Sequence, residues 1–255
     1  MLGIERRRKI MERLEEEKKV YVTELAKEFQ VTEETIRRDL ERLEKEDLLC
    51  RSYGGAVLSE KMQGVLSFAR RSSINTTGKD SIASAAAALI TDGTRLMLDA
   101  STTCQALLPQ LKERKDVVVL TNSAQALTSS ANLPCSIISS GGLLRPHSLA
   151  LTGPVACRTL SNYCVDFAFI SCKGLDLTQG VMESSEEETA VKQVMLKQAR
   201  HIVLLADASK FGHQAFLKIC PLNVINTIIT DSEPPTEWQK LCADQNIRII
   251  VAEKK

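Results

Sequence analysis

Hydrophobic residues near the N-terminus recur at the three-to-four-residue spacing of a helix. They lie among many charged side chains as far as Leu49, a pattern typical of small amphipathic helices. A first helix is expected through residue 17, with apolar positions at Ile4, Ile10, Met11 and Leu14. A second, shorter helix is expected after the N-cap Thr23, with apolar positions at Leu25, Ala26 and Phe29.

A third helix is expected after a short turn at Gln30 and Val31. Thr32 is its expected N-cap, and the buried stripe should consist of Ile36, Leu40 and Leu43, at i, i+4 and i+7. Off this stripe lie four polar side chains, Thr35, Arg37, Arg38 and Arg42. Two helices joined by a short turn, with basic and hydroxyl residues near the start of the second, are the layout of a helix-turn-helix. The second helix of that motif enters the major groove of DNA.

The segment after the third helix favours a wing. In the run CRSYGGAV, Gly54 and Gly55 permit a tight turn, with Tyr53 beside it, and Arg51 can reach a phosphate or a minor groove. The alternative is a charged amphipathic hairpin with solvated arginines, which occurs in many proteins.

The charge balance alone gives mild support to that alternative. The net charge is +1; residues 1–58 hold 13 Lys and Arg against 14 Asp and Glu, and the remainder holds 20 against 18. Nucleic-acid-binding domains are commonly basic. The acidic residues crowd at 15–17 and 44–47, however, away from the proposed contact surface. A locally basic face is therefore compatible with the balance.

After about Lys79 the chain becomes poor in charge and rich in Ala, Val, Ile, Ser and Thr. This shift marks a domain boundary, so we expect a DNA-binding domain at 1–57, a linker with a short helix at 58–77, and a second domain at 78–255. Predicted helices there alternate with short apolar runs, which predicts an α/β domain with a mostly parallel sheet. The runs are RLMLDA, DVVVLTN, CSIISSGG, VDFAFIS, HIVLLAD, VINTIITD and IRIIVA.

Most of these runs end in polar or small residues, where a strand gives way to a loop. The carboxyl ends of parallel strands form the ligand site of such sheets, and helix N-termini there bind anions. The hydroxyls and amides at the start of the helix after RLMLDA can face a phosphate together. The strand-end candidates are Asp99, Ser101, Thr102, Thr103, Thr121, Asn122, Ser139, Gly141, Gly142, Ser171, Asp207, Thr230 and Asp231.

Charged groups complete this expected site. Lys79, Lys173 and Lys210 supply counter-charge for an anion, and Asp99 and Asp207 can accept hydrogen bonds from sugar hydroxyls. The alternative is structural, because Ser and Thr after a strand are often N-caps and aspartates at strand ends form turns. That interpretation is favoured for any single residue and is weaker for the whole set.

Other features of the sequence limit the class of protein. No apolar run approaches the about 18 residues of a membrane span, and the charged N-terminal segment is unlike a signal peptide, so a cytoplasmic protein is expected. The eight cysteines lie in apolar stretches without a C-x-x-C pair or histidines at metal-ligand spacing. We interpret them as reduced core thiols and expect neither a metal nor a cofactor.

The run VTEETIRRDLERLEKEDLLCRSYGGAV resembles the winged helix-turn-helix signature of the DeoR family of bacterial transcription regulators. In that family a Val-Ser/Thr-x-x-Thr-Ile-Arg-Arg-Asp-Leu helix precedes a Gly-Gly-Ala wing. Asp47 stands where the family usually has Gly, and Tyr53 where it usually has His. The matching residues are Val31, Thr32, Thr35, Ile36, Arg37, Arg38, Asp39, Leu40, Arg51, Gly54, Gly55 and Ala56.

The second domain also resembles the family. Its LDASTTC, LTNS, SGGLLRP and LADASKFG match the Asp-x-x-Thr-Thr, Thr-Asn, Gly-Gly and Asp-x-Ser-Lys-Phe-Gly of the family's effector domain, so the resemblance covers residues 3 to about 231. It implies a Rossmann-like sensor domain related to ribose-5-phosphate isomerase and the CoA transferases. It also implies an inducer that is usually a phosphorylated sugar or sugar derivative.

Catalysis is the competing function, since the resemblance relates the second domain to isomerases. Aldose-ketose isomerisation needs a carboxylate base and polar groups that stabilise an enediolate. In the loop SCKGLD, which resembles the acidic loop of the isomerases, only Asp176 remains, and the helix start explains the acidic residues 186–188. A CoA transferase would need a nucleophilic Glu in a glycine-rich loop, and none is evident. Binding without turnover is therefore expected.

The sequence thus predicts a transcriptional regulator, in this family most often a repressor of a sugar operon, with a sugar-phosphate isomerase-like enzyme as the alternative. It should bind double-stranded operator DNA and a phosphorylated sugar, and repeated half-sites imply a homo-oligomer, a dimer or tetramer. The expected DNA contacts are Thr32, Thr35, Arg37, Arg38, Arg51, Tyr53, Gly54 and Gly55. The expected effector contacts are Asp99, Ser101, Thr102, Thr103, Thr121, Asn122, Gly141, Gly142, Lys173, Asp207 and Lys210.

Overall fold

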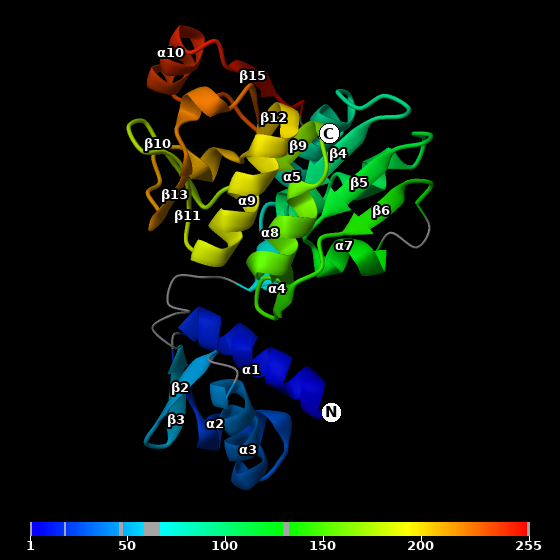
Figure 1. Cartoon of the computed structure of the whole chain (residues 1–255). Coiled ribbons are helices and arrows are strands. Elements are labelled where there is room, and N and C mark those ends of the chain that lie inside the picture. Colours follow the sequence, from blue (N-terminus) through cyan, green and yellow to red (C-terminus); the bar gives the residue numbers. More distant parts are fainter. Residues whose placement is uncertain (1, 18, 46–47, 59–66, 130–132, 254–255) are drawn as a thin grey trace. The chain divides into compact units, whose positions relative to one another are not determined.

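A computed structural model describes residues 2–17, 19–45, 48–58, 67–129 and 133–253 (Figure 1). The chain divides into two compact units, Met1–Arg70 and Arg71–Lys255. The division falls within α4 (Phe68–Ser73), inside the segment 58–77 that the sequence assigns to a linker. In the described ranges, no helix has the length and apolar character that a membrane crossing requires.

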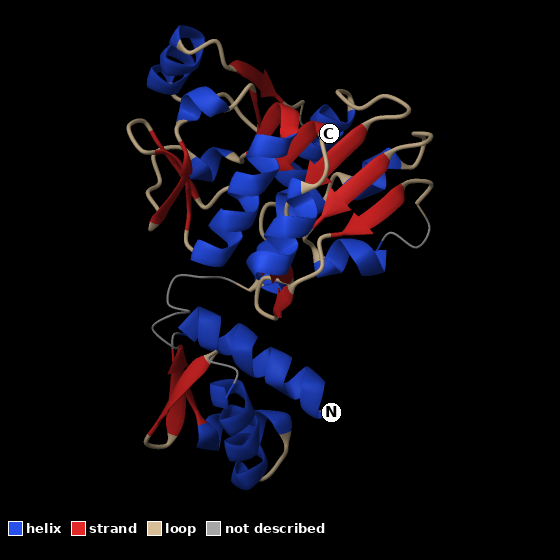
Figure 2. Ribbon diagram, in the orientation of Figure 1, coloured by secondary structure: helices blue, strands red, loops and turns tan. Residues whose placement is uncertain are grey.

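The first unit consists of three helices and a small antiparallel sheet (Figure 2). In this sheet β3 lies between β1 and β2, with Tyr21 opposite Gly55 and Ser52 opposite Gly55 on the other side. The elements are α1 (Gly3–Glu17), β1 (Lys19–Tyr21), α2 (Val22–Phe29), α3 (Glu33–Lys45), β2 (Leu49–Ser52) and β3 (Gly55–Leu58).

The predicted stripe of the third helix is confirmed, because Ile36, Leu40 and Leu43 are all buried in the core of this unit. The first helix, expected through residue 17, is also confirmed as Gly3–Glu17, and Ile4 in its first turn is 73% exposed. One other expectation for this unit is wrong. The second helix starts at Val22 rather than after an N-cap at Thr23, because the Val22 N–H donates to the carbonyl of Gly54 at 2.9 Å. The hairpin backbone thus replaces a side-chain cap.

The second unit is built on a seven-stranded sheet in which every neighbouring pair is parallel. Each of the seven apolar runs forms one of its strands, so the predicted α/β domain is confirmed. The strands are β4 (Arg95–Leu98), β5 (Val118–Thr121), β6 (Ser136–Ser139), β9 (Val165–Ile170), β12 (Ala199–Leu205), β14 (Thr227–Thr230) and β15 (Arg248–Val251).

The strand order of this sheet is β15-β14-β12-β9-β4-β5-β6. The chain starts at β4, moves outward to β6, returns to β9 on the other side of β4, and then moves outward to β15. This is the doubly wound order of a Rossmann-like fold, and its direction reverses between β4 and β9. In such sheets the carboxyl ends of the two strands at the reversal lie beside the usual ligand site.

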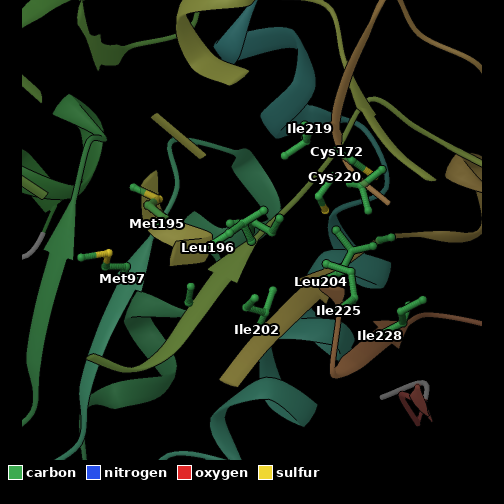
Figure 3. Close-up of a cluster of buried hydrophobic side chains, with 14 of the residues drawn as sticks. Met97, Cys172, Met195, Leu196, Ile202, Leu204, Ile219, Cys220, Ile225 and Ile228 are labelled. Carbon is green, nitrogen blue, oxygen red and sulfur yellow. The ribbon is translucent and has the colours of Figure 1, made fainter. Parts of the chain in front are cut away.

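Helices cover both faces of the sheet (Figures 1 and 2). Successive strand residues point to opposite faces: Met97 packs in one cluster, with residues of α8 and α9, while Leu96 and Leu98 pack in the other, with residues of α5. Figure 3 shows the first cluster, in which Met195 and Leu196 of α9 lie near strand residues such as Ile202. The helices are α5 (Thr76–Ala87), α6 (Thr102–Gln105), α7 (Ala124–Ser129), α8 (Gly153–Ser161), α9 (Glu186–Gln198) and α10 (Thr236–Asp244).

Several short elements beside the sheet were not predicted from the sequence. Each strand has three or four residues, too few for a visible alternation of polar and apolar positions. One antiparallel pair joins β7 (Leu143–Arg145) to β8 (Ala150–Thr152), and a three-stranded sheet has the order β10-β11-β13. The remaining elements are β10 (Gly174–Asp176), β11 (Gly180–Glu183), β13 (Leu217–Cys220) and the 3₁₀ turns Leu108–Leu111, Ala208–Lys210 and Leu222–Val224.

Candidate functional site

The start of α3 presents hydroxyl and basic side chains to solvent. The side chains of Arg37 and Arg38 are 55% and 77% exposed. Each is paired with a glutamate one turn earlier, Arg37 with Glu33 at 2.7 Å and Arg38 with Glu34 at 3.3 Å. Such exposed i,i+4 pairs are weak. Both guanidinium groups can therefore exchange a carboxylate partner for a phosphate or a base at little cost.

Thr32 caps α3, as predicted. Its Oγ1 accepts from the Thr35 N–H at 3.3 Å, and its carbonyl accepts from the Ile36 N–H at 3.2 Å. The hydroxyls of Thr32 and Thr35 lie 2.9 Å apart. Hence the two threonines of the candidate DNA-contact set meet at the first turn of the helix.

A buried ion pair fastens α3 to α1. Oδ2 of Asp39 lies 2.5 Å from Nε of Arg6, and Oδ1 lies 3.2 Å from a terminal nitrogen of Arg7. Asp39 was noted in the sequence only as part of the resemblance. The structure shows that it faces the interior of the unit, because it is 4% exposed.

The strands β2 and β3 form the predicted wing. Tyr53 is fully exposed at its tip, and Gly54 has φ +79°, a left-handed conformation that favours glycine. Gly55 is required for a different reason, since a Cβ there would lie 2.1 Å from the carbonyl oxygen of Val20. Arg51 is paired with Glu44 of α3 at 2.6 Å. Asp47, which departs from the family pattern, lies outside the described residues.

In the second unit, the ends of β4 and β9 are joined directly. Asp99 follows β4 and accepts hydrogen bonds from the backbone N–H groups of Ser101 and Ser171, each at 2.9 Å. Ser171 follows β9. Asp99 is 2% exposed, so its carboxylate holds two strand ends together and is not presented to solvent. The structural alternative therefore describes Asp99 better than the sugar-hydroxyl role.

Two charged residues that were not singled out in the sequence complete this arrangement. Lys192 of α9 lies 3.3 Å from Asp99 and 2.5 Å from Glu183 of β11, and it donates to the Ser171 carbonyl at 2.8 Å. Lys192 and Glu183 are 5% and 3% exposed. We call Asp99, Glu183 and Lys192 the buried charge triad.

The three groups of the triad hold one another in the charged state. Burial by itself raises the pKa of Asp99, but the Lys192 charge and hydrogen bonds from Ser101 and Ser171 outweigh it, so the pKa is lowered. The pKa of Glu183 is lowered in the same way against burial, chiefly by Lys192. Burial lowers the pKa of Lys192, and its two carboxylate partners reverse this and raise it.

The loop after β4 leaves donors available. Ser101 caps α6, because its Oγ accepts from the Cys104 N–H at 3.1 Å. Among the described residues, the backbone N–H groups of Thr102 and Thr103 have no acceptor, and neither hydroxyl has a partner. Amides and hydroxyls at the carboxyl end of a strand are the groups that bind phosphate in related sheets.

Four other predicted site residues are engaged within the protein. The Thr121 hydroxyl donates to the Leu98 carbonyl at 2.8 Å, and the Asn122 side-chain amide donates to the Leu151 carbonyl at 3.1 Å. Both Gly141 and Gly142 have positive φ, and a Cβ on Gly142 would lie 2.4 Å from the Thr152 carbonyl oxygen. Gly142 thus permits the close approach of β8 at this point.

Asp207 and Lys210 flank the 3₁₀ turn after β12. Asp207 caps this turn, since Oδ1 accepts from the Ser209 N–H at 2.9 Å. Nζ of Lys210 lies 3.8 Å from Oδ2 of Asp207, and the lysine side chain is 27% exposed. Lys79, expected as counter-charge, instead donates to the backbone carbonyls of Arg71 and Ile74.

Lys173 lies in the loop between β9 and β10, two residues after Ser171. It is half-buried, and removal from water, together with the like charge of Arg71, lowers its pKa to about 8. Among the described residues its ammonium group has no hydrogen-bond or carboxylate partner. Lys173 is therefore a half-buried cation that has no carboxylate partner among the described residues.

Asp176, the one acid retained in the loop SCKGLD, shapes a turn. Its Oδ1 accepts from the Thr178 hydroxyl at 2.7 Å and from the N–H groups of Thr178 and Gln179, and its Oδ2 accepts from Gln214 at 2.7 Å. These hydrogen bonds, with that from the Thr178 side chain foremost, lower its pKa well below the usual range. A carboxylate held in this way is a poor proton acceptor.

Comparisons with known proteins agree with this two-unit organisation. A sequence model of the DeoR-like helix-turn-helix domain matches residues 6–62, and one of the DeoR C terminal sensor domain matches residues 74–232. The chain is also similar to a solved structure of ribose 5-phosphate isomerase A from Methanocaldococcus jannaschii. That similarity has a TM-score of 0.39 and 19% identity, and it covers 52% of this chain and 53% of the other.

Full-length relatives carry names of transcriptional regulators. The HTH-type transcriptional regulator YulB of Bacillus subtilis (strain 168), described as uncharacterized, is 39% identical over 98% of this chain and 96% of its own length. A putative aga operon transcriptional repressor of Escherichia coli O157:H7 is 33% identical over 97% and 93%. The glycerol-3-phosphate regulon repressor of Escherichia coli (strain K12) is 28% identical over 98% and 99%. With both domains matched and such relatives aligned over nearly its whole length, the chain belongs to the DeoR family of transcriptional regulators.

Proposed function

We propose that the protein represses a sugar-metabolism operon and releases its operator when a phosphorylated sugar binds the second unit. The observation that carries this proposal is that one chain combines two units. The first has an exposed basic helix and a wing, and the second has a Rossmann-like sheet. The names of two relatives, a putative aga operon repressor and a glycerol-3-phosphate regulon repressor, support the chemistry of the effector.

The proposed DNA surface consists of the first turns of α3 and the wing. Arg37 and Arg38 read guanine or clamp phosphates in the major groove, with Thr32 and Thr35 at the helix start. Arg51, Tyr53 and the Gly54–Gly55 turn contact the adjacent backbone. The solvent exposure of the arginines and of Tyr53 supports this assignment.

The proposed effector site lies where β4 and β9 end. Thr102 and Thr103 offer amides and hydroxyls without protein partners to a phosphate, and Lys173 and Lys210 supply positive charge. Ser101 and Asp99 shape the loop that presents these donors. We assign Thr121, Asn122, Gly141 and Gly142 to the support of this edge, and Asp207 to the orientation of Lys210.

We further propose that this site binds without turnover. An isomerase would need a carboxylate free to take a proton from carbon, yet Asp99 and Asp176 are both engaged by N–H and O–H donors. A homo-oligomer is proposed because a repressor that binds repeated half-sites must present two recognition helices. The bacterial cytoplasm is the compartment in which such a repressor meets its operator.

The test uses the full-length protein and a labelled DNA fragment from upstream of its own gene. We expect binding in the nanomolar range at physiological salt, and release by at least one of a panel of sugar phosphates. Lys210→Ala should bind this DNA normally and respond less to the ligand. Turnover of any sugar phosphate by the protein, without DNA binding, would refute the proposal.

A further inference from the structure

The cations of α3 and the wing differ in whether a carboxylate holds them. Those with a carboxylate partner, at 2.6–3.3 Å, are Arg37, Arg38, Lys45 and Arg51. Arg42 is exposed on α3, and among the described residues its guanidinium has no ion-pair or hydrogen-bond partner. The charge of Arg42 is therefore not matched within the part of the chain that the structure describes.

The carboxylates of α3 are all engaged with other cations. The pairs are Glu33 with Arg37, Glu34 with Arg38, Asp39 with Arg6 and Arg7, Glu41 with Lys45, and Glu44 with Arg51. Glu33, Glu41 and Glu44 stand at i, i+8 and i+11, so they share one side of the helix with Arg37, at i+4. Arg37 thus lies on the acidic side of α3.

Arg42 lies on a different side of α3, together with two of the residues proposed to contact DNA. Thr35, Arg38 and Arg42 stand at i, i+3 and i+7, which places their side chains on one stripe of the helix. The buried residues of α3 lie off this stripe. If Arg38 faces the DNA, Arg42 therefore faces it too, about one helical turn further along.

Binding to DNA has different consequences for paired and unpaired cations. When a paired arginine takes up a phosphate, its glutamate is set free and attracts a cation from solution in place of the one that the phosphate loses. An unpaired arginine has no carboxylate to displace, so the phosphate releases its counterion outright. The number of counterions released determines how steeply the DNA affinity falls with salt.

We propose that Arg42 binds a DNA phosphate and that this contact, rather than those of Arg37 and Arg38, gives α3 its salt-dependent affinity. The inference rests on the proposed function and adds to it a residue and the group that this residue recognises. Phosphates carry no sequence information of their own. Arg42 therefore contributes affinity for any DNA sequence, and Arg38 is available for a base.

Fluorescence anisotropy tests this with the full-length protein and two labelled DNA fragments, one from upstream of its own gene and one of unrelated sequence. A slope of about 0.9 per phosphate, counted from 1 M salt, predicts that Arg42→Gln binds about 15-fold more weakly than the wild type at 50 mM salt and about fourfold more weakly at 200 mM. Both fragments should show these ratios. Arg42→Lys should keep the wild-type salt slope, because an ammonium also neutralises a phosphate.

Lys45→Gln is the matched control. It removes the same charge from the same helix, but from a cation that lies 2.9 Å from Glu41. Its DNA affinity should stay within about twofold of the wild type, with an unchanged salt slope. Thermal unfolding without DNA should be the same in all variants, because both side chains are exposed.

Three results would overturn the inference. They are a wild-type salt slope in Arg42→Gln, an equal loss of slope in Lys45→Gln, and a loss of affinity confined to the upstream fragment, which would make Arg42 a base-reading residue. Each of these leaves the proposed repressor function standing. Failure of every sugar phosphate to release the DNA would refute the proposed function and leave the Arg42 contact standing, and a wild type that binds neither fragment refutes both.

Discussion

Nε of Arg6 lies 2.5 Å from Oδ2 of Asp39, so the first helix of the chain is fastened to the helix that is proposed to enter DNA. Both side chains are nearly excluded from water, at 9% and 6% exposure. A pair of this kind contributes less through its own attraction than through the cost of leaving either partner buried alone. It fixes the angle at which α3 stands on α1.

Replacement of Asp39 by Ala should therefore destabilise the first unit strongly. Arg6 would remain buried without its partner, and the expected loss is about 3–5 kcal/mol of unfolding free energy. Denaturant unfolding followed by far-UV circular dichroism measures the loss. Arg8→Ala is the matched control, because Arg8 forms an exposed pair with Glu12 and should change stability by less than about 0.5 kcal/mol. An equal loss of unfolding free energy in the two variants would show that the buried pair does not stabilise the first unit.

The double variant Arg37→Ala, Arg38→Ala should fold normally and lose DNA affinity. Only two exposed i,i+4 pairs are removed, each worth about 0.3–0.5 kcal/mol. A base-reading arginine is worth roughly 1–3 kcal/mol at one base pair, whereas loss of a phosphate contact weakens all sequences alike and lowers the salt slope by about one. Fluorescence anisotropy at several salt concentrations separates the two cases. Unchanged operator affinity would exclude this face of α3.

Gly55→Val should abolish DNA binding without affecting the second unit. Its Cβ would collide with the Val20 backbone, which cannot move without separating β1 from β3. Gly54→Asn is the control, since the space around Gly54 is open and Asn tolerates a left-handed φ. Thermal stabilisation by a sugar phosphate should be the same in both variants. Normal DNA affinity of Gly55→Val would show that the segment is only a connection.

The buried charge triad predicts how stability depends on pH. Asp99 and Glu183 have folded pKa values below their ordinary values of about 4, so their stabilisation is complete above those values and is lost as the pH falls through the folded ones. The raised pKa of Lys192 preserves its contribution at all pH values below about 10. The unfolding temperature of the second unit should thus be constant near neutrality and fall below about pH 4.

Lys192→Met should reverse that pattern. It leaves two buried carboxylates without a counter-charge, at an expected cost of about 3–5 kcal/mol at pH 7. The cost should shrink on acidification toward pH 4–5, because the two carboxylates then protonate more readily than in the wild type. Calorimetric scans across this range measure the difference. A penalty that does not vary with pH would show that Lys192 acts through packing alone.

The fold of the second unit follows closely from its sequence. Seven apolar runs that alternate with helices predict a parallel sheet, and all seven runs form strands of one sheet. The recognition helix was predictable for a similar reason, because the spacing of Ile36, Leu40 and Leu43 marks the buried face and so defines the exposed one. Periodic patterns of this length depend on local geometry alone.

The charge triad was not predictable in this way. Lys192 and Glu183 are nine residues apart and lie on a helix and a strand whose packing brings both to Asp99, which precedes them by more than 80 residues. A lysine within the charged helix EETAVKQVML is indistinguishable in sequence from a solvated one. The cap at Val22 was missed for the same reason, because its acceptor is the backbone of Gly54.

Arg37 and Arg38 form ion pairs with Glu33 and Glu34. These pairs affect how the protein finds its operator among non-specific DNA sequences. In the proposed complex, each arginine exchanges a carboxylate of its own helix for a phosphate, so a random sequence adds no ion pair to those that Arg37 and Arg38 already form. Such an exchange gives little net affinity, and residence on non-specific DNA should be brief. An operator adds base contacts to this exchange, and its affinity rises accordingly. The near-neutral charge of the first 58 residues thus favours a high ratio of specific to non-specific binding.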